Sequence, residues 1–199
     1  MSSEVKANKL SPSSGTALQI SDSGDTTTIP SGATLAIASG ATIANSGTQT
    51  GFGLFSSYAI IADQKAQNTV SGTFTSGAWR TRDLQTEVSD PDGIVSISAN
   101  AFTLGAGTYF IKWHCPNSYV NRTQSRLYNS TDASEAAIGW SIEGYYSTSN
   151  GGSARVTIAG SKAFTIEHQC STTRADEGFG WQGDMGIEQY TTVEIFKEA

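Results

Sequence analysis

Three segments of the chain alternate between apolar and polar side chains, as half-buried β-strands do. They lie at residues 108–115, 163–170 and 193–195. One side carries the apolar positions, which are Tyr109, Ile111, Trp113, Cys115, Phe164, Ile166, His168, Cys170, Val193 and Ile195. The other side carries Phe110, Lys112, His114, Thr165, Glu167, Gln169 and Glu194. Each segment is therefore predicted to be a strand with one face in a core.

Further short runs between turn clusters are also predicted strands. They are residues 58–62, 69–74, 94–99, 125–128, 137–142 and 155–158. Clusters of Gly, Asn, Asp, Ser and Pro predict turns at residues 90–93, 105–107, 129–132 and 150–152. We interpret the first of these as a Pro-containing turn in preference to a calcium loop. About eight to ten strands without helical interludes predict an all-β antiparallel sandwich over residues 52–199.

Composition changes abruptly near residue 51. All 19 aromatic residues lie at Phe52 or later, and 27 of the 40 residues from Ser11 to Thr50 are Ser, Thr, Gly or Ala. Ser-Gly-Ala-Thr begins at Ser31 and returns at Ser39, eight residues later. Each unit joins a Gly turn to a few isolated apolar side chains, and two or three such units cannot enclose a core.

Other copies of the chain are the simplest cover for those apolar side chains. The segment is therefore predicted to be a thin β-repeat stalk of a homotrimer, packed through Ile29, Leu35, Ile37 and Ile43. A flexible linker is the alternative interpretation. Residues 1–51 are expected to combine this stalk with an anchor to other proteins, for which the apolar positions are Val5, Leu10, Leu18 and Ile20.

The charge balance and hydropathy argue against several classes of protein. Twelve basic and 18 acidic residues give a net charge of −6, which argues against a nucleic-acid partner. Only 15% of the residues are charged, which argues against helix bundles and coiled coils. No stretch approaches the ~20 apolar residues of a membrane span, and no signal peptide is evident. We expect synthesis in a cytosol and no membrane insertion.

Few residues form a catalytic or metal-binding pattern. The sequence has no Gly-rich phosphate loop, nucleophile elbow or CxxC pair. At most three of His114, Cys115, His168 and Cys170 can meet, because neighbours in a strand face opposite sides. Buried thiols, a disulfide and a metal site remain open, with thiols favoured. His168 is expected to be hydrogen-bonded in the core or an interface. We expect no enzyme activity, cofactor or metal.

Aromatic residues in predicted loops are the remaining candidates for binding. Tyr145 and Tyr146 precede a predicted Ser/Gly/Asn loop at residues 147–153, Phe179 and Trp181 share another loop, and Tyr119 lies in a third. Rings flanked by small polar groups suit the binding of sugars or protein surfaces. The alternative is that these rings cap the sandwich or pack against a neighbouring subunit.

Several strings resemble a known family. Residues 102–109, which read Phe-Thr-Leu-Gly-Ala-Gly-Thr-Tyr, resemble the strand opening in trimeric jelly rolls of the complement globular-head and tumour-necrosis-factor class. Residues 58–65, 77–84, 126–129, 168–170 and 193–199 resemble a family of C-terminal domains in tailed-bacteriophage structural proteins. Residues 10–12 and 28–34 resemble the leader segments of phage fibre-like proteins. That family commonly has a His where this chain has Thr123, so no His-based site is carried over.

The resemblance implies a homotrimeric, non-enzymatic virion protein with a jelly-roll head. The leading hypothesis is a short fibre or knob on the virion surface, anchored to other virion proteins by its N-terminus, whose head contacts a host glycan or protein. A capsid decoration or cement protein is the alternative. A bacterial carbohydrate-binding module is a third and more distant one.

Overall fold

The computed structural model describes residues 14, 20, 23–42 and 54–199. The chain falls into two compact units, Met1–Thr48 and Gln49–Ala199. The domain boundary predicted at residues 51 and 52 lies outside the described residues, and it stays a prediction. Within the described residues, no helix is both long and apolar enough to cross a lipid bilayer.

The described part of the second unit forms eleven strands. They are β1 (Phe55–Lys65), β2 (Arg80–Thr81), β3 (Thr86–Ser89), β4 (Val95–Ser98), β5 (Ala101–Leu104), β6 (Gly107–Ser118), β7 (Asn121–Asn129), β8 (Ser134–Gly144), β9 (Ser147–Ile158), β10 (Lys162–Cys170) and β11 (Glu188–Glu198).

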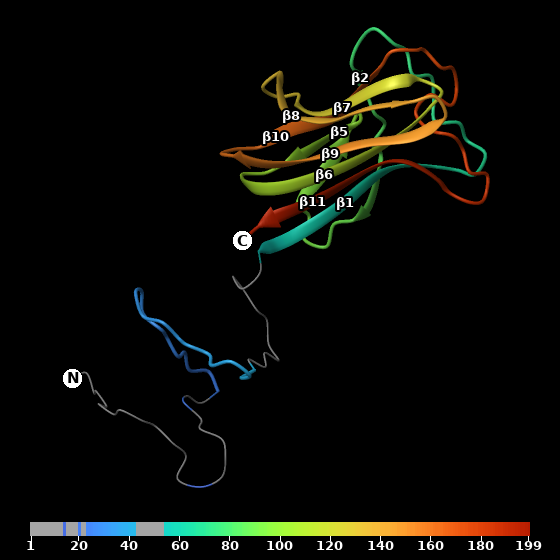
Figure 1. Cartoon of the computed structure of the whole chain (residues 1–199). Coiled ribbons are helices and arrows are strands. Elements are labelled where there is room, and N and C mark those ends of the chain that lie inside the picture. Colours follow the sequence, from blue (N-terminus) through green and yellow to red (C-terminus); the bar gives the residue numbers. More distant parts are fainter. Residues whose placement is uncertain (1–13, 15–19, 21–22, 43–53) are drawn as a thin grey trace. The chain divides into compact units, whose positions relative to one another are not determined.

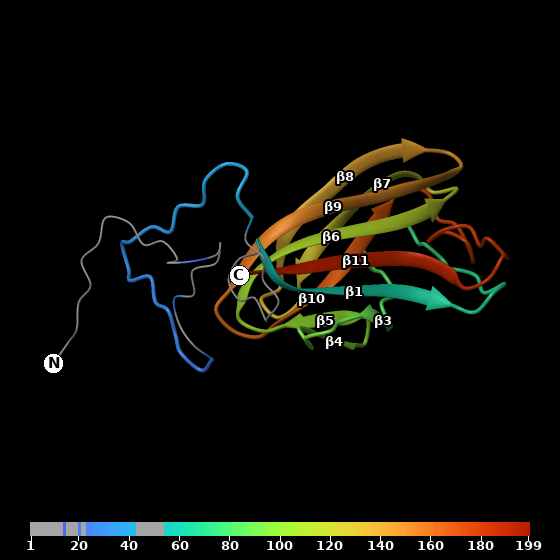
Figure 2. The same ribbon diagram turned by 90° about the horizontal axis from the view of Figure 1, so that it is seen from below.

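Eight of these strands pair in a nested antiparallel order. β1 pairs with β11, β5 with β10, β6 with β9, and β7 with β8. Pairing of β11 with β6 and of β10 with β7 joins them into two sheets, and β3 and β4 add an edge strand to each. The orders are β3-β1-β11-β6-β9 and β4-β5-β10-β7-β8, with β2 beside β10. In the jelly-roll topology the first strand pairs with the last, and each later strand pairs with a correspondingly earlier one, down to a central hairpin. The two sheets form the layers seen in Figure 1 and Figure 2. The predicted antiparallel jelly-roll sandwich is confirmed.

The facing sides of the two sheets enclose one main core. Most apolar positions of the three alternating segments are buried there, including Tyr109, Ile111, Trp113 and Ile195. The opposite side of β6, with Phe110 and Lys112, faces outward as the alternation predicts. A smaller cluster at one end contains Phe74, Val120 and Cys170. The period-two pattern therefore assigns the buried face of these strands correctly.

The strand β9 corrects two sequence-based predictions, the turn at residues 150–152 and the loop at residues 147–153. The strand continues through both. A Cβ on Gly151 would lie 2.5 Å from the carbonyl oxygen of Trp113, and one on Gly152 would lie 2.3 Å from its ring atom Cζ2. Gly151 is therefore required by the close approach of the β6 backbone, and Gly152 by the bulk of the Trp113 ring, and neither by a chain reversal.

The predicted strand at residues 69–74 is also corrected. Only isolated bridges form there, from Gly72 to Glu177 and from Phe74 to Arg174. The partner segment is the irregular loop after β10, which offers no extended neighbour for a continuous ladder.

Residues 23–42 of the first unit form turns joined by extended chain, and no strand. Gly24, Gly32 and Gly40 have φ of 93°, 82° and 82°, so the turns recur every eight residues. The side chains of Ile29, Leu35 and Ile37 are 49%, 65% and 46% exposed. An extended segment becomes a strand only when another segment pairs with it, so the predicted β stalk, which requires other copies of the chain, stays a prediction.

The other predicted stalk and anchor residues are accounted for as follows. Ile20 is 72% exposed. Val5, Leu10, Leu18 and Ile43 lie outside the described residues.

Candidate functional site

The jelly-roll unit has two different ends. The chain enters β1 at Phe55, which pairs with Glu198 near the end of β11. The 12-residue strand β6 begins near this end and runs to Ser118. The connections β6–β7, β8–β9 and β10–β11 form the opposite end, which we call the distal end. Figure 2 shows the start of β1 and the C-terminus at one end and these loops at the other.

Four of the predicted binding residues come together at the distal end, and we call them the ring cluster: Tyr119, Tyr145, Tyr146 and Trp181. The ring centroid of Tyr119 lies 5.8 Å from those of Tyr145 and Tyr146, and 5.7 Å from that of Trp181. Tyr145 and Tyr146 are each 69% exposed, and Trp181 is 51% exposed. Three loops that are distant in sequence therefore present one exposed aromatic surface.

The central ring of the cluster is positioned by a constrained hairpin between β6 and β7. Tyr119 has a φ of 56°, a conformation that costs a bulky residue free energy. The next residue, Val120, is fully buried, and its carbonyl accepts a hydrogen bond of 3.2 Å from the Thr172 amide. Burial of Val120 thus turns the ring of Tyr119 outward.

A cation lies over the same ring. The Arg174 guanidinium carbon is 5.0 Å from the Tyr119 ring centroid, and the same guanidinium donates a hydrogen bond of 2.6 Å to Glu177.

Tyr145 and Tyr146 form the two-residue connection between β8 and β9. The hairpin is short, so both rings are held at its tip and not on a long loop.

The fifth predicted binding residue, Phe179, does not belong to the ring cluster. Its ring stacks on Phe74 with centroids 4.5 Å apart, and the Arg82 guanidinium lies 4.5 Å from the Phe179 ring centroid. Phe179 is half-buried and packs against the smaller apolar cluster. The prediction that Phe179 is a surface binding residue is not supported by its position, since the ring supports the loop that carries Trp181.

Two buried polar side chains lie beneath this end. Arg82 is 1% exposed, donates from Nε to the Thr191 hydroxyl at 2.8 Å, and donates from one terminal nitrogen to the Phe179 carbonyl at 2.8 Å. Burial lowers the pKa of Arg82. His168 is fully buried, yet neither ring nitrogen has a hydrogen-bond partner in the described part of the chain. The prediction of a core position for His168 is correct, and the prediction of a hydrogen-bonded ring is wrong.

The sequence did not predict two further exposed apolar residues at this end. Met185 is 96% exposed and Ile187 is 73% exposed. The Glu188 carboxylate fixes their loop by accepting hydrogen bonds from the amides of Gly183, Asp184 and Asn68, and these bonds lower the pKa of Glu188. The sequence signal was an acidic residue placed just after a Gly-rich loop, where a carboxylate can accept several amide hydrogen bonds.

The remaining candidate chemistry has structural explanations. Cys115 and Cys170 are free and buried, and burial raises the pKa of each thiol to about 11. Among the described residues, no group of three or more His, Cys, Asp or Glu side chains is placed to hold a metal ion. Both carboxylate oxygens of Asp90 accept backbone hydrogen bonds, from Ile94 and Val95. Those bonds fit the predicted turn at residues 90–93.

Comparisons with known proteins give likenesses of fold. No family model matches the chain, and no curated protein matches it. The globular domain of zebrafish complement 1qA protein is similar with a TM-score of 0.46 and 16% identity, over 71% of this chain and 96% of that one. The Eiger TNF of S. frugiperda gives 0.49 and 12%, over 71% and 92%. PRD1 vertex protein P5 gives 0.46 and 14%, over 74% and 100%. Similarities this weak transfer neither an oligomeric state nor a ligand, so the fold assignment rests on the strand pairing.

Proposed function

We propose that this chain is a non-enzymatic bacteriophage virion protein. In this proposal it forms a homotrimeric short fibre or knob on the particle surface, is anchored to other virion proteins by its N-terminal segment, and contacts the host surface through the ring cluster. The observation that carries the proposal is that the two ends of the head differ. The exposed rings lie at the end opposite the point where the chain enters β1, which is the arrangement that an anchored adhesin needs.

The exposure of the ring cluster supports a role in recognition. Exposed aromatic side chains in contact with one another are a typical feature of binding sites, because they bring large apolar area at low entropic cost. Tyr119 is held in a strained conformation at the centre of the cluster. Strain of this kind is common at functional sites, where surrounding contacts maintain it.

A second aromatic surface supports self-association. On the outward side of the β1-β11-β6 sheet, the ring of Phe55 lies 5.2 Å from that of Phe196 and 6.5 Å from that of Phe110. Tyr58 of the same sheet is 43% exposed. Apolar area on a sheet face favours cover by another protein surface. The exposed Ile29, Leu35 and Ile37 of the repeat segment require cover in the same way.

The virion assignment draws its support from the sequence resemblance to phage structural proteins.

Adsorption of particles to host cells tests the role of the ring cluster. The triple variant Tyr145→Ala, Tyr146→Ala, Trp181→Ala is expected to join particles normally and to reduce adsorption strongly, since aromatic hot spots are worth about 2 kcal/mol or more each. Ile138→Ala removes an exposed apolar side chain of β8 outside the ring cluster, and this matched control should adsorb like the unchanged protein.

The same particles separate the fibre from the capsid-cement alternative. A cement protein predicts normal adsorption by the triple variant. It also predicts that particles lacking the protein burst at a lower temperature than complete ones. That pair of results would overturn the proposed role in host contact.

A further inference from the structure

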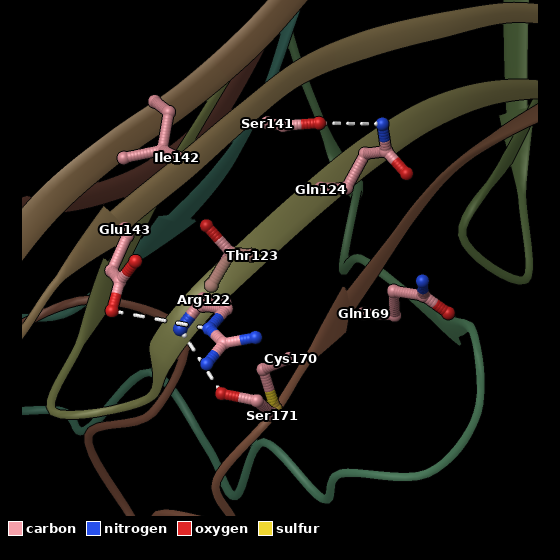
Figure 3. A pocket seen from close by; sticks show the side chains of 9 residues that line it. All are labelled: Arg122, Thr123, Gln124, Ser141, Ile142, Glu143, Gln169, Cys170 and Ser171. Carbon is pink, nitrogen blue, oxygen red and sulfur yellow. Dashed lines mark hydrogen bonds and ion pairs between the residues drawn. The ribbon is translucent and has the colours of Figure 1, made fainter.

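A shallow groove of about 420 Å³ crosses the outer face of the β8-β7-β10 sheet. Its polar lining residues include Arg122, Gln124, Ser141, Glu143, Gln169 and Ser171. Figure 3 shows these side chains, with Arg122 and Glu143 facing each other across neighbouring strands. The volume lies in the range of about 300–1,000 Å³ that is typical of small-ligand sites.

The groove offers hydrogen-bonding groups that form no bond with any other residue that the structure describes. The Gln124 amide donates one bond, to the Ser141 hydroxyl at 2.8 Å, so its oxygen and second N–H stay available. The Gln169 side chain makes no hydrogen bond to any residue of the described part of the chain, and no dashed line reaches it in Figure 3. The distance from Arg122 Nε to Glu143 Oε1 is 3.9 Å, which is too long for a hydrogen bond.

The charges in the groove cancel, and this narrows the chemistry of the ligand. Arg122 and Glu143 contribute one positive and one negative charge, with side chains 74% and 67% exposed. An anionic ligand paired with Arg122 would meet the Glu143 carboxylate beside it. An apolar ligand would leave the two amides without partners, which carries a desolvation cost. A neutral ligand with many hydroxyl groups can donate and accept at every one of these positions.

We propose that this groove binds a neutral oligosaccharide, an inference that rests on the proposed function of the head in contacting a host surface. The groove adjoins the ring cluster. Arg122 pairs with Glu143, and Asn121 pairs with Gly144, the residue before Tyr145. Two residues of strand cover about 7 Å, so the Arg122–Glu143 end of the groove lies next to Tyr145. An extended saccharide can therefore bind its hydroxyls in the groove and stack a ring face on the cluster.

Binding of the full-length protein to a printed glycan array tests this proposal. The array carries neutral hexose oligomers, neutral N-acetylhexosamine oligomers, oligouronates and sulfated oligosaccharides. We expect binding to neutral oligomers. The double variant Gln124→Ala, Gln169→Ala should weaken that binding about tenfold or more, equivalent to about 1.4 kcal/mol. Its control, Ser96→Ala with Thr103→Ala, removes two hydroxyls from β4 and β5 of the same sheet, outside the groove, and should bind normally.

Each other outcome counts against the proposal. Binding confined to acidic glycans, no binding to any glycan, or neutral-glycan binding that the double variant leaves unchanged would overturn it. Adsorption to host cells that is abolished by protease and survives periodate oxidation of the cell-surface sugars would assign the contact to a protein.

The two proposals fail separately. Normal adsorption by the ring-cluster variant, together with groove-dependent glycan binding, would overturn the role of the cluster in host contact and leave the groove intact. Loss of adsorption in that variant, together with no binding of the unchanged protein to neutral glycans, would overturn the groove proposal and leave the role of the cluster in host contact intact.

Discussion

Lowering the pH from 7 to 5 is expected to destabilise the fold through one side chain, His168. The ring is fully buried, and its centroid lies 4.9 Å from that of Phe74. Burial lowers the pKa of His168 well below 6.5, and the positive charge of the buried Arg82 lowers it further. The folded protein therefore holds the ring neutral where the unfolded chain protonates it.

The direction and size of the effect follow from this difference in pKa. The ring of an unfolded chain titrates near pH 6.5, so the contribution to stability is fully present above that pH. As the pH falls below 6.5, the free energy of unfolding decreases by about 1.4 kcal/mol per pH unit until the pKa of the folded state is reached. If the folded ring stays neutral to pH 5, the loss between pH 7 and 5 is about 2 kcal/mol. Carboxyl groups contribute little in this window, because most of their titration in the unfolded chain lies below pH 5.

Urea denaturation at pH 5, 6 and 7, at one protein concentration, measures this loss. The variant His168→Leu removes the titrating ring and two nitrogens that lack partners, so its stability should be nearly independent of pH in this range. The only other histidine, His114, is exposed and contacts Ser149, and His114→Gln should keep the full slope. A wild-type protein equally stable at pH 7 and 5, or a His168→Leu variant with the wild-type slope, would refute the reasoning.

Three further predictions concern assembly and the core. Native mass spectrometry should give three times the chain mass of 20.9 kDa, near 63 kDa, and a stable monomer at micromolar concentration would contradict the trimer. A thiol probe should modify Cys115 and Cys170 only after denaturation, and neither a reductant nor a chelator should change the melting temperature. A drop of several degrees with the reductant would indicate a disulfide, and one with the chelator would indicate a metal. Gly152→Ala should cost about 1–3 kcal/mol by overpacking against Trp113, while Gly160→Ala, which meets no atom within 4 Å, should be nearly neutral.

The sequence predicts the sandwich well because its strands are half-buried. On β6 and β10 one face must be apolar and the other polar, so a period of two appears in the sequence and identifies both the strand and its buried side. The same logic failed for β9. Its residues Asn150, Gly151 and Gly152 form a buried stretch of small and polar side chains, which has the composition of a turn. The reasons for that composition lie far away in the sequence: Asn150 bonds with Ser125 and with the carbonyl of Trp140, and the two glycines lie against the backbone and the ring of Trp113. No local pattern contains this information.

The sequence predicts which types of residue and which loops form the candidate site, but not how they are arranged in space. Aromatic residues beside Gly and Ser pointed to the loops of Tyr119, Tyr145 and Trp181, and the structure places these rings together. The sequence could not separate Phe179 from Trp181, two residues apart, because their different surroundings depend on Phe74 and Arg82 from a distant segment. The groove was missed because its residues come from β7, β8 and β10, and single Gln and Ser residues carry no sequence signal.

The buried charge of Arg82 connects the core to the ring cluster. The guanidinium is 1% exposed, and one of its terminal nitrogens has no hydrogen-bond partner among the described residues, so its burial costs stability. Its hydrogen bonds reach the Thr191 side chain on β11 and the backbone carbonyl of Phe179, and an apolar side chain could not make either bond. The carbonyl belongs to the loop that carries Trp181, so this arginine fixes the backbone from which one ring of the cluster projects. Arg82 thus costs stability in the core but gives a surface loop a defined position. An exposed aromatic residue on a loop held in this way loses less entropy when it binds.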